Sequence, residues 1–197
     1  MSQNKRKIKV GLTGGIGSGK TFVGEVFNRL GLPVFNADFH AKKCMREVKE
    51  LKDQICKKFG DEIYKDRELQ KERLSDIIFS DYEKLQELNS IVHPFVNIAF
   101  KEWVKKQEEM CLIKEAAILF ESGANKYLDV VVCVSSSMDL RIRRVMKRDN
   151  CTKERVIQRI SMQMLQEEKE KLSDFIIVNN GGQLILPQLI NIIKQIS

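Results

Sequence analysis

Eight residues near the N-terminus constrain this chain more than any other stretch. Residues 14–21 read GGIGSGKT, which satisfies the pattern G-x-x-x-x-G-K-[ST] of a phosphate-binding P-loop. Such a loop needs a strand before it and a helix after it. Alternating apolar residues precede it at 8–13, and apolar residues at helical spacing follow it at 19–30. The context therefore predicts a P-loop that binds phosphate, in preference to a glycine-rich turn without a ligand.

The residue types of the loop indicate a nucleoside triphosphate such as ATP. Glycines let backbone N–H groups turn toward phosphate oxygens. Lys20 is expected to reach the β- and γ-phosphates, and Thr21 to offer its hydroxyl to Mg²⁺ as the metal ligand. The N-terminus of the next helix adds a partial positive charge. The expected nucleotide-binding residues are Gly14, Gly15, Ile16, Gly17, Ser18, Gly19, Lys20 and Thr21.

Strand and helix patterns alternate along the rest of the chain. Further strands are expected at 33–38, 111–121, 130–134 and 175–178, and further helices at 138–148, 153–167 and the end of the chain. This alternation predicts an α/β protein with a five-stranded parallel sheet. Because ligands bind outside the carboxyl ends of such strands, the P-loop, Asp38 and Glu121 are expected to share one edge.

A long, mostly helical stretch separates the second and third predicted strands. Residues 40–110 are more than a crossover between parallel strands needs. Apolar spacing predicts a helix that stops at Phe59-Gly60, a helical run from Leu74 to Leu88, and a further helix opened by Pro94. We expect a helical domain that closes over an acceptor substrate. The predicted organisation is a nucleotide-binding core (1–39, 111–137 and 168–197), an acceptor domain (40–110) and a lid (138–167).

Two acidic residues follow predicted strands. Asp38 is a candidate base that accepts the proton of an attacking hydroxyl, with helix N-capping as the alternative. Glu121 follows the apolar run 117–120, an arrangement that resembles the element whose acid helps to place Mg²⁺. Apolar runs that end in an acid are also frequent without such a role.

The stretch 141–159 is unusually basic, with eight Lys or Arg residues against Asp149 and Glu154. Two basic helices late in a P-loop chain are typical of a lid, whose arginines neutralise the transferring phosphoryl group and displace water. Arg148 is the best candidate for this role, with Arg144 one turn earlier on the same face. A solvated helical face is the alternative.

The overall composition limits other classes of function. The net charge is +7, but basic residues are mostly interleaved with acids and aromatic residues make up 7% of the chain. We therefore expect polyanionic small molecules in preference to nucleic acid. No apolar run reaches about 18 residues, and the N-terminus lacks the apolar core of a secretory signal, so no membrane partner and a cytoplasmic location are expected. The five cysteines form no C-x-x-C pair, so no zinc site is expected. His93 precedes Pro94, which favours an extended conformation there.

Several motifs together resemble the dephospho-CoA kinase family. They are GLTGGIGSGKT at 11–21, NAD at 36–38, VHP at 92–94, LFE at 119–121 and KRDN at 147–150, and the resemblance covers roughly residues 8–182. It implies a P-loop nucleoside-kinase-like three-layer fold, a helical CoA-binding insert and a helical lid. It also implies ATP- and Mg²⁺-dependent phosphorylation of the ribose 3′-hydroxyl of dephospho-CoA, the last step of CoA synthesis, by a monomer.

The resemblance also implies roles for individual residues. Asp38, Lys20 and Arg148 take catalytic positions, and Arg144 and Arg148 join the P-loop in nucleotide binding. The expected acceptor-binding residues are Asp38, Arg73, His93 and Glu121. This chain departs from the family pattern at Asn36, where an acid is common, and at Ala117, where proline is common. Two other hypotheses stay open at this point: another nucleoside or nucleotide kinase, and a nucleic-acid-binding ATPase that uses residues 141–159.

Overall fold

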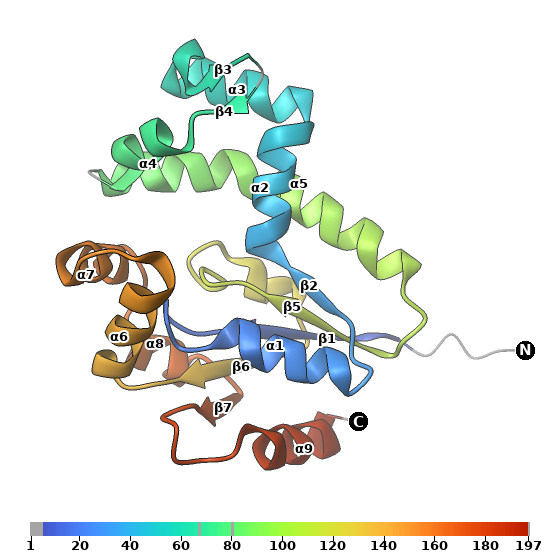
Figure 1. The fold of residues 1–197 in the computed structure, drawn as a ribbon. Helices are drawn as coiled ribbons and strands as arrows, with labels where there is room; N and C mark the ends of the chain where they lie inside the picture. The colour runs from blue at the N-terminus through green and yellow to red at the C-terminus, as the bar shows by residue number, and fades with distance from the viewer. Residues whose placement is uncertain (1–5, 67, 80, 197) are drawn as a thin grey trace, which may run out of the picture. The chain divides into compact units, whose positions relative to one another are not determined.

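The computed structural model describes residues 6–66, 68–79 and 81–196, and it divides into two compact units (Figure 1). The first unit comprises the chain up to Asn36 and from Lys106 onward. The second comprises Ala37–Lys105. Among the described residues, no helix is long and apolar enough to cross a membrane.

The first unit is built on a five-stranded parallel sheet with the strand order β2-β5-β1-β6-β7. The strands are β1 (Ile8–Thr13), β2 (Val34–Asn36), β5 (Cys111–Glu115), β6 (Val130–Ser135) and β7 (Phe175–Val178). β1 is central, with Leu12 opposite Glu115 of β5 and Thr13 opposite Cys133 of β6. The predicted α/β class and the five-stranded parallel sheet are confirmed.

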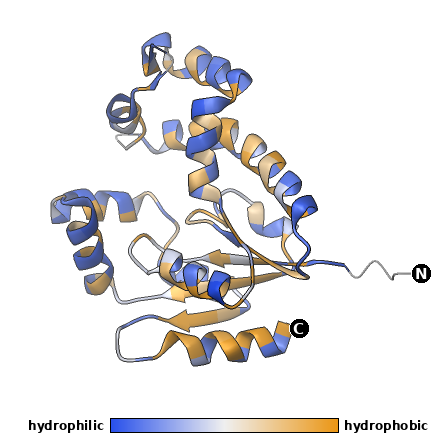
Figure 2. Cartoon of the chain, turned by 45° about the vertical axis from the view of Figure 1, so that its right-hand side comes forward, coloured by the Kyte–Doolittle hydropathy of each residue, from blue (hydrophilic) through white to orange (hydrophobic). Residues whose placement is uncertain are grey.

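Helices cover both faces of this sheet. α1 (Lys20–Arg29) and α9 (Ile185–Ile196) share one apolar core with the strands, in which Phe27 and Leu189 are completely buried (Figure 1). α8 (Gln166–Lys171) packs on β6 from the other face, where Gln166 contacts Cys133. The sheet therefore lies between two helical layers. Figure 2 shows its strands as largely hydrophobic and α7 as largely hydrophilic.

The basic stretch forms two helices with a small core of their own. α6 (Met138–Asp149) and α7 (Lys153–Ser161) enclose Ile142, Val145, Val156 and Ile160. The hydroxyl of Thr152 caps α7 by accepting the N–H of Arg155. The predicted helix at 153–167 is too long, because α7 ends at Ser161 and α8 begins at Gln166. The backbone N–H of Met164 donates to the carboxylate of Glu121 across this break, and this bond takes the place of a helical one.

The second unit is mainly helical, as expected for this stretch. Its elements are α2 (Ala37–Glu47), α3 (Lys49–Phe59), η1 (Asp61–Ile63), β3 (Tyr64–Lys65), β4 (Glu68–Leu69), α4 (Lys71–Phe79) and α5 (Tyr82–Lys106). Gly60 ends α3 with a φ of 95°, which favours glycine and agrees with the predicted stop. The β3–β4 hairpin was not predicted, because two-residue strands leave no periodic pattern.

The predicted helix boundaries near Pro94 are wrong. Asp81 caps α5 by accepting the N–H groups of Glu83 and Lys84, so the predicted run from Leu74 to Leu88 is two helices. α5 then continues through Pro94, and His93 is therefore helical and not extended. The physical reason is burial. The helix buries Leu88, Val92, Val96 and Phe100, which recur every four residues on both sides of the proline. Such residues contribute about 1.5–3 kcal/mol each, against about 3 kcal/mol for an internal proline.

β5 ends six residues earlier than predicted, at Glu115 and not at Glu121. The pairing of β5 with β1 ends there because β1 is followed directly by the P-loop. Its last hydrogen bond is the one from the N–H of Ala116 to the carbonyl of Leu12. The chain then turns, with the N–H of Ser122 bonded to the carbonyl of Ile118. Leu119 is completely buried in this turn, so its apolar character reflects packing of a turn and not a strand.

A buried lysine in β5 leads to a prediction about stability. Burial lowers the pKa of Lys114 to about 8, so the folded state resists its charge. This cost is fully present below pH 8, and it disappears as the pH rises toward the pKa of the unfolded chain, about 10.4. Lys114→Met should therefore raise the free energy of unfolding at pH 7 by up to about 3 kcal/mol. Urea titrations from pH 7 to 10.5 should show the gain shrinking. A similar gain in the exposed control Lys126→Met would contradict the explanation.

Candidate active site

The P-loop joins β1 to α1 through a backbone that needs glycine. Gly17 has a φ of 81°, and a Cβ there would lie 2.5 Å from the carbonyl oxygen of Arg141. Gly19 has a φ of 97° and precedes α1 directly. Two completely buried hydroxyls, those of Thr13 and Ser18, have no hydrogen-bond partner among the described residues. Unsatisfied buried groups are costly and point to a missing partner, as expected where a loop awaits a ligand.

Side chains from the C-terminal half of the chain hold the outer side of this loop. Arg141 Nε donates to the carbonyl of Ile16 at 3.0 Å, and Arg144 Nη1 lies 3.4 Å from the carbonyl of Gly17 and 3.3 Å from that of Ser18. Asn179 Nδ2 also donates to the Ser18 carbonyl, at 2.8 Å.

The direction of these carbonyls determines the direction of the amides. The N–H of a trans peptide points opposite to its carbonyl, so the N–H groups of Gly17 and Gly19 point away from the arginines. Lys20 Nζ donates to the carbonyl of Gly15 at 3.3 Å, within the loop. The N–H groups of Gly17 and Gly19 and the ammonium of Lys20 are donors of the kind that suits phosphate oxygens.

Glu115, a residue that the sequence pattern did not indicate, contacts the first turn of α1. Its Oε1 accepts the hydroxyl of Thr21 at 2.8 Å, and its Oε2 accepts the side-chain amide of Asn36 at 2.9 Å. Glu115 is buried at the end of β5. Glu115 therefore occupies the position at the end of this strand that was predicted for the carboxylate of Glu121. Asn36, the departure from the family pattern, supplies a neutral donor to this carboxylate.

The hydroxyl of Thr21 and the carboxylate of Glu115 are hard oxygen donors of the kind that Mg²⁺ prefers. No group of three or more candidate metal ligands occurs among the described residues. Mg²⁺ usually takes one or two protein oxygens together with substrate phosphates, so a pair is sufficient. These residues fit the predicted ion.

The contacts of Glu115 predict the effect of removing its charge. Glu115→Gln can keep its oxygen toward the Asn36 amide and turn its NH₂ toward the Thr21 hydroxyl, which accepts as well as donates, so the substitution removes the negative charge and keeps both hydrogen bonds. We expect kcat to fall about tenfold and the Mg²⁺ concentration needed for half-maximal rate to rise. Steady-state rates over a Mg²⁺ titration would measure both.

A second substitution provides the matched test for Glu115. Asn36→Asp together with Glu115→Gln exchanges donor and acceptor. The double variant should recover part of the rate, because the carboxylate introduced at position 36 restores the negative charge and accepts the amide introduced at position 115. If the double variant is as slow as the single one, the loss of negative charge is not the cause.

The predicted arginines take different positions. Arg144 contacts the P-loop, and its Nη2 also donates to the carbonyl of Asn179 at 3.0 Å. Arg148 does not reach the loop. Its Nε and Nη2 donate to the two carboxylate oxygens of Asp149 at 2.7 and 3.0 Å. The side chain of Arg148 is 62% exposed, and Asp149 also forms an ion pair with Arg159. These two arginines lower the pKa of Asp149, chiefly through the hydrogen bond from Arg148.

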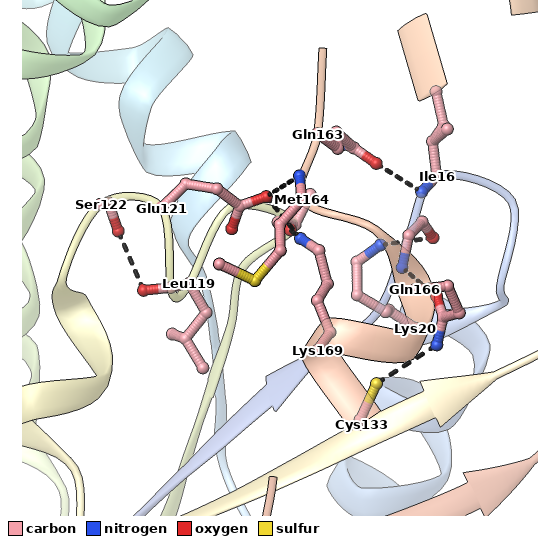
Figure 3. A network of polar contacts seen from close by, with 12 residues as sticks. Ile16, Lys20, Leu119, Glu121, Ser122, Cys133, Gln163, Met164, Gln166 and Lys169 are labelled. Atoms are coloured by element: carbon pink, nitrogen blue, oxygen red, sulfur yellow. Dashed lines mark hydrogen bonds and ion pairs between the residues drawn. The ribbon is translucent and has the colours of Figure 1, made fainter. Parts of the chain in front are cut away.

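Glu121 is committed to other parts of the chain. Its Oε1 accepts Lys169 Nζ at 2.6 Å and the backbone N–H of Met164 at 2.9 Å (Figure 3). Its Oε2 is buried without a hydrogen-bond partner in the part of the chain that the structure describes. The hydroxyl of Thr21 is bonded to Glu115, whereas the hydrogen bonds of Glu121 go to Lys169 and Met164.

The remaining candidates belong to the second unit. Asp38 is exposed in the first turn of α2, which begins at Ala37. It is therefore not the N-cap, and that alternative is excluded. Arg73, in α4, forms an exposed ion pair with Glu62. His93 lies partly buried in α5.

Several residues that hold the P-loop were not predicted. Arg141 is almost fully buried, and its guanidinium fills the space where a Cβ on Gly15 would lie. Gln163 and Gln166 accept the N–H groups of Ile16 and Gly15. These partners are about 150 positions apart in the chain, so local spacing carries no signal for them. Burial raises the pKa of the nearby Cys133 thiol to about 11, so it stays protonated at neutral pH.

Comparisons with solved structures agree with this geometry. A crystal structure of TT1252 from Thermus thermophilus has a TM-score of 0.84 and 31% identity, covering 98% of this chain and all of that one. A dephospho-CoA kinase from Campylobacter jejuni has a TM-score of 0.65 and 27% identity, covering 96% of both chains. A shikimate kinase from Acinetobacter baumannii, with a TM-score of 0.52 and 15% identity over 98% of this chain and 93% of that one, shares the fold.

Sequence comparisons are more specific. A dephospho-CoA kinase of Bacteroides fragilis is 35% identical over 187 residues, which cover 94% of this chain and 91% of the relative. One from Chlorobium chlorochromatii is 36% identical and covers 91% and 88%. The family model described as dephospho-CoA kinase matches residues 8–184. The resemblance carried by the motifs is thereby confirmed, and the chain belongs to the dephospho-CoA kinase family.

Proposed function

We propose that this protein transfers the γ-phosphoryl group of ATP to the ribose 3′-hydroxyl of dephospho-CoA, giving CoA and ADP. The observation that carries the proposal is the P-loop, whose carbonyls are held outward and whose Thr21 is bonded to Glu115, in a chain of this family. The family acts on a small molecule, and a P-loop kinase uses a nucleotide.

On the nucleotide side, the P-loop residues bind the phosphates, and Arg144 serves nucleotide binding by holding the carbonyls of Gly17 and Ser18. Lys20 places its charge between the β- and γ-phosphates, and Thr21 contributes its hydroxyl to Mg²⁺ beside Glu115. Bound Mg²⁺ would neutralise phosphate charge. Arg148 leaves Asp149 and approaches the transferring group when the α6–α7 pair acts as a lid. That exchange is inexpensive, since an exposed ion pair contributes only about 0–1 kcal/mol.

On the acceptor side, Asp38 orients the 3′-hydroxyl and takes its proton as the oxygen attacks phosphorus. We assign residues 40–110 as the acceptor domain, 138–167 as the lid and the rest as the core. Arg73 and His93 are proposed to contact the acceptor. Glu121 is proposed to serve the acceptor through the turn after β5, because its Oε1 is bonded to Lys169 and Met164 and its Oε2 is buried.

Two of the basic residues at 141–159 argue against the nucleic-acid hypothesis. Arg141 and Arg144 bond to the carbonyls of the P-loop and so are not available to a phosphate backbone. We therefore propose no nucleic-acid partner. A cytoplasmic monomer is part of the same proposal.

The test is an assay of acceptor specificity. ADP release should be measured with dephospho-CoA, AMP, CMP and shikimate in parallel, with the position of the new phosphate determined by NMR. Turnover with dephospho-CoA alone, giving the 3′-phosphate, is the expected result. Activity on AMP, CMP or shikimate without activity on dephospho-CoA would favour the hypothesis of another nucleotide or small-molecule kinase.

A further inference from the structure

The stretch that leaves α7 and enters α8 contacts both the P-loop and the turn after β5. We call residues 162–169 the connecting segment. Its side chains reach the loop through Gln163 and Gln166, and they reach the turn through Lys169 (Figure 3). It is also the chain's route from α7 back to the sheet, because α8 packs on β6.

Gln166 holds the peptide that joins Gly14 to Gly15. Its Oε1 accepts the N–H of Gly15 at 2.8 Å, and the side chain is almost fully buried. Its Nε2 donates to the carbonyl of Val134 at 3.3 Å and to Glu170 at 2.9 Å, and it also lies 3.3 Å from the sulfur of Cys133. The amide group is therefore locked in one orientation, with its oxygen toward the P-loop.

Gln163 holds the next peptide of the loop. Its Oε1 accepts the N–H of Ile16 at 2.9 Å. The carbonyl of the same peptide belongs to Gly15, and it accepts both Lys20 Nζ and the N–H of Ser18. Turning this peptide would break the contact of Lys20 with the loop. The two glutamines therefore determine the direction of two consecutive peptides at the start of the P-loop.

An ion pair anchors the segment on its other side. Lys169 is completely buried and donates to Glu121 Oε1 and to the carbonyl of Ala117, each at 2.6 Å. The N–H of Met164 donates to the same carboxylate oxygen. Because the turn and the P-loop both belong to the first unit, the anchor fixes the glutamines relative to the loop.

We infer that Gln166 and Gln163 are positioning residues for the phosphate donor, which hold the P-loop peptides of Gly15 and Ile16 in the orientation that ATP binding requires. The inference rests on the proposed function only in that the loop binds ATP. It assigns Glu121 and Lys169 the task of anchoring these glutamines. It also gives the α6–α7 pair, the proposed lid, a direct connection to the loop that it covers.

Gln166→Met tests the inference, because it keeps the length of the side chain and removes its hydrogen bonds. We expect the Kd for ATP, measured by calorimetry well below the melting temperature, to rise about tenfold. Gln163→Met is the second variant. It changes a half-buried side chain that the fold should tolerate, and we expect a rise of about threefold to tenfold. Gln158→Met, at an exposed position of α7, is the control and should change the Kd less than twofold.

A charge-preserving exchange separates positioning from stability. In Gln166→Glu with Glu170→Gln, a carboxylate oxygen still accepts the Gly15 N–H and the bond between 166 and 170 is reversed, while the donor to the carbonyl of Val134 is lost, which should lower the melting temperature. This double variant should bind ATP within about threefold of the unchanged protein, even if its melting temperature falls as far as that of Gln166→Met. If Gln166→Met and Gln163→Met lower the melting temperature but leave the Kd for ATP, KM and kcat unchanged, the inference is overturned.

The readout also separates this inference from the proposed function. ATP binding is measured without an acceptor, so failure of the unchanged protein to phosphorylate dephospho-CoA would overturn the proposed function alone. Unchanged ATP binding in both glutamine variants would overturn the inference alone.

Discussion

Replacing Asp38 with asparagine should lower kcat with dephospho-CoA by about 10² to 10⁴ and change the Kd for ATP less than about twofold. Asparagine keeps the size of the side chain but cannot accept the proton of the attacking hydroxyl. Asp38 lies in the second unit, outside the P-loop, so ATP binding should not depend on it. Single-turnover rates with saturating ATP would isolate the chemical step.

The chain offers a matched control for Asp38. Glu50 is an exposed acid in the first turn of α3, as Asp38 is in the first turn of α2. Both side chains interact favourably with a helix dipole, at about 0.3–1 kcal/mol. Glu50→Gln should therefore match the stability change of Asp38→Asn and leave kcat intact. Equal rates in the two variants would show that Asp38 serves only its helix.

The parts of the site that could be predicted from sequence are those built by neighbours in the chain. The P-loop, the strand before it and the helix after it lie within residues 8–30, and their pattern is local. Parallel strands also place their carboxyl ends at one edge, so Glu115 and Asn36 meet there. The same rule led to the prediction for Glu121, because the apolar run 117–120 continues the pattern of β5 into a buried turn.

The parts that could not be predicted depend on contacts between distant segments. Gln166 has no periodic or compositional feature, and its partner Gly15 lies 151 positions earlier. Arg141 and Arg148 are alike in sequence. Arg141 lies near the start of α6 and is buried against the P-loop, whereas Arg148 lies in the last turn and is exposed on Asp149, so position along the helix separates them and not the face that they occupy. The prediction that a helix begins at Pro94 failed for a different reason. Burial of one face of α5 contributes more free energy than an internal proline costs.

Replacing Arg148 with alanine should lower kcat by about 10² to 10³ and change the Kd for ATP less than about threefold. In the structure this guanidinium is bound to Asp149, and it is available for exchange because its side chain is mostly exposed. Negative charge develops on the oxygen between the β- and γ-phosphorus atoms as its bond to the γ-phosphoryl group breaks, so an arginine that approaches then stabilises the transition state more than bound ATP. Loss of the side chain should therefore appear in kcat and not in KM.

Two variants of the same helices make this expectation specific. Arg143→Ala removes an exposed arginine of α6 that donates to the carbonyl of Asp139, and it should keep kcat within about twofold. Asp149→Asn weakens the partner that holds Arg148 while leaving the arginine in place, so its kcat should stay far above that of Arg148→Ala. A rise in KM for ATP without loss of kcat in Arg148→Ala would assign the residue to ground-state binding. An equal loss in Arg143→Ala would mean that the helices act through their total charge and that Arg148 has no particular role.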